Sequence, residues 1–123
     1  MSFRDEVMQI ITRMRNSVEK TRLLLLRHTS DNLSGIKQAE VLTYEDSVRY
    51  FVNSRPDDER IVKGALLQRP KDTATLVIWL FLDENNLPLS DEKGNPYGRK
   101  LLAARLDEEL REWFGDKDVL IVE

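Results

Sequence analysis

The chain has 123 residues, of which 41% are hydrophobic and 33% are charged, and its formal net charge at pH 7 is −3. This length and composition are typical of one globular domain, so we expect a single domain over residues 1–123. No run approaches the roughly 18 apolar residues that cross a bilayer, and the absence of cysteine excludes disulfides, thiol nucleophiles and thiolate metal sites. The N-terminal residues do not resemble a secretory signal, so we expect a cytoplasmic protein that makes no membrane contact.

Residues 3–27 are predicted to form one long amphipathic helix. No glycine or proline interrupts them, and a polar cluster at 29–32 favours a turn where the helix ends. Apolar side chains recur at the three- and four-residue spacings of a buried helical face, at Phe3, Val7, Ile10, Ile11, Met14, Val18 and Leu25. Four leucines at 23–26 surround the end of this helix, so at least one of them points away from the core of its own chain.

Basic side chains follow the same predicted helix in two rows. The first row, opposite the apolar side, is Arg13, Lys20 and Arg27, each seven residues apart. The second row, which flanks the apolar side, is Arg4, Arg15 and Arg22, eleven and seven residues apart. A basic stripe on one helix is typical of contact with nucleic-acid phosphates. The same arginines can instead meet acidic groups of a second protein copy, because residues 72–123 hold 12 acidic and 6 basic side chains. A solvated face whose long stems cover apolar neighbours is the third interpretation.

Residues 34–42 are compatible with a short helix or an edge strand. Thr43 with Asp46 forms a partial capping pattern, which predicts a helix over 44–53 that ends before Pro56. This helix is expected to bury Val48, Phe51 and Val52.

Two strands are predicted next, over 61–68 and 73–82, with a proline turn between them that favours an antiparallel hairpin. Seven successive apolar residues at 76–82 indicate burial on both faces and therefore a central position in the sheet. Gly64 is expected to mark a bulge or a close approach of the backbone.

A long polar connection over 83–96 leads to a predicted helix over 97–114, which Gly115 caps, and to a short strand over 119–122. The core stripe of that helix is expected at Leu102, Leu106, Leu110 and Trp113. A helix between two strands favours parallel neighbours. We therefore predict an α+β (mixed α/β) fold in the order α-(short element)-α-β-β-α-β. Its small mixed sheet of about three to four strands is packed by the long N-terminal helix and the crossover helix.

The sequence contains no recognisable catalytic, metal-binding or cofactor-binding motif. His28 is the only histidine, which excludes multi-histidine metal sites. The glycines form no phosphate-binding loop, and the nearest pattern is the segment 94–100, where Arg99 and Lys100 near a predicted helix start can hold an anion. A plain loop-to-helix junction is the favoured interpretation of that segment. The acids of the 83–96 loop, Asp83 in particular, can bind magnesium or, as favoured here, stay solvated.

Three functional hypotheses follow. The favoured one is a non-enzymatic protein–protein interaction or regulatory domain that forms a homodimer through its N-terminal helix or binds another protein. The first alternative is a nucleic-acid-binding accessory protein, and the second is a small metal-dependent hydrolase with magnesium near Asp83. The binding residues expected for a protein or nucleic-acid partner are Arg13, Arg15, Lys20, Arg22 and Arg27.

Overall fold

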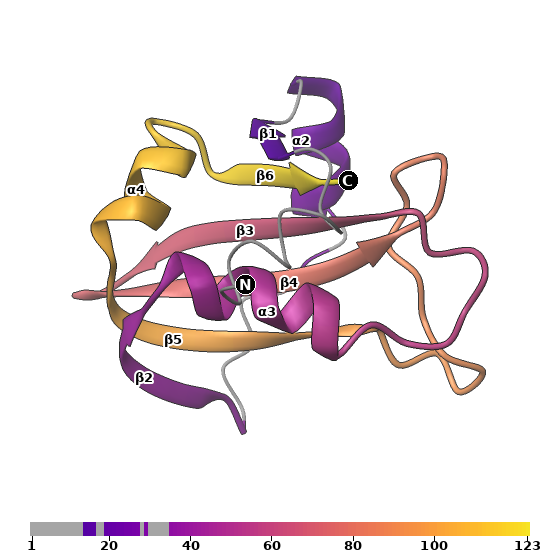
Figure 1. Ribbon diagram of the computed structural model, residues 1–123, viewed down its shortest axis with the longest axis horizontal. Coiled ribbons are helices and arrows are strands. Elements are labelled where there is room, and N and C mark those ends of the chain that lie inside the picture. The colour runs from indigo at the N-terminus through magenta and orange to yellow at the C-terminus, as the bar shows by residue number, and fades with distance from the viewer. Residues whose placement is uncertain (1–13, 17–18, 28, 30–34) are drawn as a thin grey trace, which may run out of the picture.

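The computed structural model describes residues 19–27, 29 and 35–123 in full and residues 14–16 as backbone. Within these residues a six-stranded mixed sheet carries helices on its faces, in the strand order β1-β6-β3-β4-β5-β2 (Figure 1). The elements in chain order are β1 (Met14–Asn16), α2 (Glu19–Arg27), β2 (Lys37–Leu42), α3 (Tyr44–Asn53), β3 (Lys63–Lys71), β4 (Ala74–Leu82), β5 (Gly98–Leu106), α4 (Glu108–Phe114) and β6 (Val119–Val122). No described helix is both long and apolar enough to cross a membrane.

Strands β3 and β4 form the predicted antiparallel hairpin at the centre of the sheet, with Lys71 opposite Ala74 at its turn. The prediction that the apolar run of β4 is buried on both faces is confirmed. One core cluster contains Val77, Trp79 and Phe81, and the cluster on the opposite face contains Leu76, Ile78, Leu80 and Leu82. Successive strand side chains point to opposite faces, so an unbroken apolar run fills two cores at once.

Helices α3 and α4 cover one face of the sheet (Figure 1). Their buried apolar side chains are Tyr44, Val48 and Phe51 of α3 and Leu110 and Phe114 of α4. The predicted start of α3 is confirmed, because the Thr43 hydroxyl accepts a hydrogen bond from the Asp46 amide at 3.0 Å. Gly64 is also a point of close approach, since a Cβ there would lie 2.5 Å from the Phe51 ring.

Helix α2 covers the opposite face of the sheet with Leu25, which is fully buried. Leu23 is 53% exposed and points away from the core, as the run of leucines predicts for at least one of them. Arg22 joins this helix to the segment before β6, because its guanidinium Nε donates to Asp118 at 2.6 Å.

The prediction of one continuous helix over residues 3–27 is wrong in the described part. Residues 14–16 form β1, which pairs antiparallel with β6, and the helix described after it has nine residues. Pairing with the edge of β6 gives residues 14–16 backbone hydrogen bonds on one side, and this tertiary contact outweighs the local helix propensity. The rest of the predicted helix, residues 3–13 and 17–18, lies outside the described residues.

The prediction of one helix over 97–114 is also wrong, because this segment contains β5 and the shorter helix α4. In β5 the side chains alternate, so that Leu101 and Ala103 join the core under α3 and α4 while Leu102 packs on the other side. Trp113 is 37% exposed rather than part of a core stripe, although Gly115 caps α4 as predicted. Pairing on both edges, with β4 and β2, stabilises the extended form of β5.

The predicted sheet was too small, and its parallel pair was placed wrongly. Strand β6 is antiparallel to both β3 and β1, and the parallel pair is β2 with β5. The ambiguous segment 34–42 contains the edge strand β2 rather than a helix. This edge position is what exposes the site described next.

Candidate functional site

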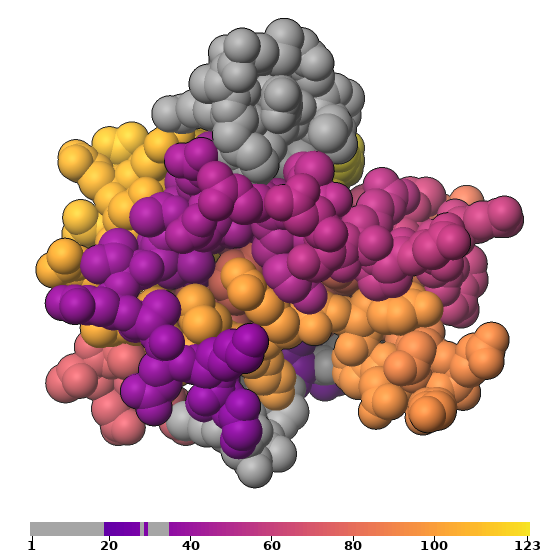
Figure 2. Space-filling view, turned by 60° about the horizontal axis from the view of Figure 1, so that its bottom comes forward, coloured from indigo at the N-terminus to yellow at the C-terminus, as the bar shows by residue number. Residues whose placement is uncertain are grey.

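Strand β2, helix α3 and strand β5 enclose an open groove of about 390 Å³, here called the β2–α3 groove. Figure 2 faces this side of the molecule, with violet atoms of β2, magenta atoms of α3 and orange atoms of β5 between them. Its lining includes Ala39 and Val41 from β2, Tyr50 and Asn53 from α3, and Arg99 and Leu101 from β5. A volume of this size is within the range of ligand-binding clefts.

The guanidinium of Arg99 contacts two neighbouring aromatic rings at one side of the groove. Its central carbon is 4.4 Å from the centre of the Tyr50 ring and 4.3 Å from the centre of the Trp79 ring. Trp79 is held in turn by a hydrogen bond from its indole N–H to the Ser47 carbonyl of α3, at 3.0 Å. Contact with two rings restricts the position of the guanidinium and stabilises its charge.

Gly98 determines where Arg99 enters the groove. Its φ of +119° is unfavourable for other residues, and a Cβ at this position would lie 1.9 Å from the Trp79 carbonyl oxygen. The bare glycine therefore lets β5 begin close against β4, which pairs Arg99 directly with Trp79 in the register of the two strands.

Arg99 differs from the other arginine of the groove in how its charge is compensated. Arg49 forms ion pairs with Glu45 at 3.1 Å and with Asp46 at 3.5 Å. The Nε atom of Arg99 is buried and has no hydrogen-bond acceptor among the described residues. Burial raises the pKa of the neighbouring Tyr50 hydroxyl, while the charge of Arg99 acts in the opposite direction. The phenol is therefore neutral at physiological pH.

Strand β2 forms one wall of the groove and is an end strand of the sheet. In the part of the chain that the structure describes, its hydrogen-bonded neighbour is β5, and no described strand pairs with its outer side. An end strand presents unpaired backbone N–H and C=O groups, which can pair with another chain.

The structure does not bring the predicted binding arginines together as one surface. Arg13 lies outside the described residues. Arg15, described as backbone, lies in strand β1, where it pairs with Ile121 of β6, and so it is not on a helix. The two basic rows therefore do not continue across residues 14–16 into α2.

The remaining predicted binding residues lie on α2, on the face of the sheet opposite to the groove. Lys20 and Arg27 are exposed. Arg22 is engaged within the chain, by Asp118 and by Glu19 at 3.1 Å. None of these three lines the β2–α3 groove.

Asp83, the predicted position for a metal, orders a turn of its own loop. Its Oδ1 atom accepts hydrogen bonds from the amides of Asn85 at 2.8 Å and Leu87 at 3.0 Å. The described residues contain no group of three or more His, Cys, Asp or Glu side chains that could hold a metal ion. His28 lies outside the described residues.

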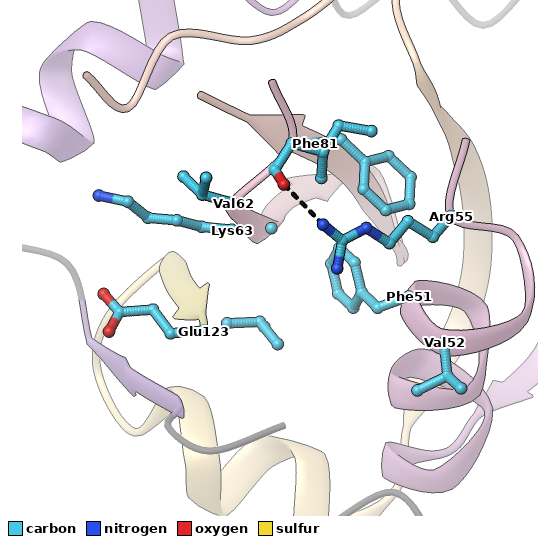
Figure 3. Close-up of a pocket in the computed structure, with 10 residues that line it drawn as sticks. Phe51, Val52, Arg55, Val62, Lys63, Phe81 and Glu123 are labelled. Carbon is cyan, nitrogen blue, oxygen red and sulfur yellow. Dashed lines mark hydrogen bonds between the residues drawn. The ribbon is translucent and has the colours of Figure 1, made fainter. Parts of the chain in front are cut away.

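A second cavity, between α3 and the start of β3, is much smaller, at about 60 Å³. In Figure 3, Phe51 and Phe81 line it, and Arg55 reaches across to donate to the Ile61 carbonyl at 2.6 Å. Lys63 extends away from the two rings in the same view. This space is too small for a typical ligand, because binding clefts hold about 300 Å³ or more.

Sequence reasoning missed Tyr50 and Trp79 as site residues. It identified Arg99 as a potential anion-binding residue but placed it at a helix start, whereas it lies in strand β5. The available signal was the Gly98-Arg99 pair after a proline-containing loop, which marks a close backbone approach at a strand start as readily as a helix junction. The partner rings come from positions 20 and more residues away, so no local pattern contains them.

Comparison of the chain with protein-family models, curated proteins and solved structures finds no match. Function is therefore inferred from the chemistry and geometry of the site itself.

Proposed function

We propose that the protein is a non-enzymatic interaction domain that binds an extended segment of a partner protein along β2, in the β2–α3 groove. The observation that carries this proposal is the open edge of β2 directly beside the groove. A partner segment that adds to β2 as a further strand gains main-chain hydrogen bonds, and every second side chain of it points into the groove.

The lining of the groove suits such a segment. Ala39, Val41 and Leu101 provide apolar contact, and Tyr50 and Arg99 provide a rigid polar end. Because the rings and the indole hydrogen bond hold Arg99 in place, little ordering is needed when a ligand binds.

The hypotheses that depend on the N-terminal helix have lost part of their basis. A helix-mediated homodimer and a nucleic-acid surface both require a continuous basic face over residues 3–27, which the strand at 14–16 interrupts. Arg22, one of its cations, is already paired with Asp118. Both hypotheses remain predictions without support from the described residues.

The proposal is tested by selecting binders from a library of short random peptides displayed on phage. The selected peptides are then titrated into ¹⁵N-labelled protein. We expect amide shifts in residues 37–42 and in α3, and slower hydrogen exchange of the β2 amides that face outward. Selected peptides that shift only other surfaces, or a library that yields no binder, would refute the proposal.

Two proline variants, Gln38→Pro and Ala39→Pro, provide a matched control. Consecutive residues of a strand direct their N–H groups to opposite edges, so one proline removes an amide at the open edge and the other removes an amide that faces β5. We expect one variant to remain folded and lose peptide binding. The other is expected to be less stable because it loses a hydrogen bond inside the sheet. Full peptide binding by both folded variants would contradict pairing with β2.

A further inference from the structure

We infer that the partner segment carries an acidic side chain, glutamate or aspartate, whose carboxylate binds the guanidinium of Arg99. This inference rests on the proposed function, because it assumes that an extended segment lies along β2. It specifies the chemistry of the partner at one point of the groove.

The first argument is the uncompensated charge of Arg99. A partly buried cation without a carboxylate partner is costly, because its lost hydration is only partly replaced. The faces of Tyr50 and Trp79 replace some of it, but aromatic rings accept no strong hydrogen bond from the guanidinium edge. No hydrogen bond or ion pair of Arg99 to a described residue replaces the rest. A carboxylate supplied by a ligand would complete the site.

The second argument is the balance of charge along the groove. The acids of α3 beside it, Glu45 and Asp46, are both paired with Arg49. Lys37 of β2 is exposed and lies opposite Leu101 in register, on the same side of the sheet as Ala39 by strand alternation. Arg49, Arg99 and Lys37, set against Glu45 and Asp46, leave the groove and its rim with an excess of one positive charge, which complements an acidic segment.

The third argument is the geometry of the stacked guanidinium. The Tyr50 and Trp79 rings, whose centres are 5.5 Å apart, lie on the same side of it. Its N–H groups point outward in the plane of the group, where a planar carboxylate accepts two parallel N–H bonds. An added strand would lie two strand spacings, about 10 Å, from β5. The acidic side chain therefore has to extend into the groove, so we expect glutamate to bind more tightly than aspartate.

The inference is tested with an array of blocked peptides that have an acetylated N-terminus and an amidated C-terminus. The host sequence alternates valine and serine, and one position at a time carries Glu, Asp or Gln. At one or two positions we expect Glu peptides to bind at least about tenfold more tightly than Gln peptides, since a charge-assisted hydrogen bond to arginine is lost in the Gln peptide. A further set without acidic side chains but with a free C-terminus tests the other source of a carboxylate.

Protein variants then assign the preference to Arg99. The Arg99→Gln variant should bind Glu and Gln peptides equally. The Arg99→Lys variant, which keeps the charge but not the planar fork, should recover only part of the preference. Arg105→Gln is the matched control, an exposed arginine of the same strand outside the groove lining, and should keep the full preference.

The outcomes separate this inference from the proposed function. Equal binding of Glu and Gln peptides that shift the β2 amides overturns the inference and leaves the proposed function standing. Stronger binding only of peptides with a free C-terminus also overturns it, because the carboxylate is then not that of a side chain. Absence of any peptide-induced shift in β2 contradicts both. The Glu-to-Gln comparison uses the unaltered protein, so it decides the question even if an Arg99 variant fails to fold.

Discussion

A single glycine determines how closely β4 and β5 approach at the point where Arg99 enters the groove. At Gly98 two effects coincide: a left-handed φ of +119° and a position for Cβ that is 1.9 Å from a backbone oxygen. The second effect cannot be relieved by rotating a side chain. Any larger residue has to push the two strands apart, and the stack on Trp79 with them.

We therefore expect Gly98→Ala to destabilise the protein by about 3 kcal/mol, from backbone strain and from loss of close strand pairing. Urea unfolding at equilibrium measures this, and tryptophan fluorescence reports the change around Trp79. The control is Gly94→Ala, which also has a positive φ, of +84°, but no atom within 4 Å of the added Cβ. It should cost only about 1 kcal/mol. Equal losses in the two variants would show that the close approach to Trp79 is unimportant.

At the scale of the elements, Asp107 joins the starts of two helices. Its carboxylate caps α4 by accepting from the Leu110 amide at 2.8 Å, and it also accepts from the Tyr44 amide at 3.1 Å, at the first residue of α3. Its own amide donates to the Leu42 carbonyl at 2.9 Å, at the end of β2. The wall of the groove formed by β2 and α3 is thus fixed to the end of β5.

Replacing this aspartate, Asp107→Ala, should cost about 2–3 kcal/mol, because a helix cap is lost and the Tyr44 amide also loses its acceptor. The comparison is Thr43→Ala, which removes only the hydroxyl cap of α3 and should cost about 1 kcal/mol. Both losses are measured from urea unfolding midpoints. A smaller loss for Asp107→Ala than for Thr43→Ala would contradict the double role.

A second connection between segments is sensitive to pH. Asp58 accepts from the Arg60 side chain at 2.6 Å and from the Tyr97 hydroxyl at 3.3 Å, which joins the segment before β3 to the segment before β5. The hydrogen bond from the Arg60 side chain holds the pKa of the Asp58 carboxyl well below its ordinary value of 3.8. The ionised carboxylate therefore stabilises the fold above pH 3.8, and this contribution is lost as the pH falls below that value.

We expect the urea midpoint of the Asp58→Asn variant to fall less steeply than that of the natural sequence when the pH is lowered from about 5 to about 2. The variant should be the less stable of the two near neutral pH. The exposed neighbour gives the control variant, Asp57→Asn, which also removes one negative charge. Parallel pH curves for Asp58→Asn and the natural sequence would exclude a contribution from this carboxyl.

The same elements show what the sequence could predict. The β3–β4 hairpin, the Thr43 cap and the Gly115 cap are local patterns, and the structure confirms all three. The prediction of one helix over 97–114 was wrong because leucines at a four-residue spacing match a helix. The alternation within β5 becomes visible only when its two neighbouring strands are known. A better signal was Asp107 followed by two glutamates, which is typical of a helix start.

At the scale of the whole molecule, the sheet is strongly buried at its central strands and exposed at its edge strand β2. Strand β4 contributes buried side chains to both cores, whereas β2 has exposed side chains at three of its first four residues. The topology that creates this difference was not predictable, because the parallel pairing of β2 with β5 joins segments about 60 residues apart. The candidate groove depends on that pairing, so the sequence indicated Arg99 alone and not the site around it.

This gradient of burial predicts the order of amide exchange in the native state. Amides of residues 64–67 in β3 and 75–80 in β4 should exchange only through global unfolding, since these residues have a strand on both sides. The outward amides of β2 should exchange fastest among the strand residues 37–122, because they have no described acceptor. Hydrogen exchange followed by NMR at increasing urea measures both classes, and the β3 and β4 values should converge on the free energy of unfolding from urea titration. If the β2 amides that face outward were as protected as those of β4, the edge would already be covered in the free protein, and a partner strand would have to displace what covers it.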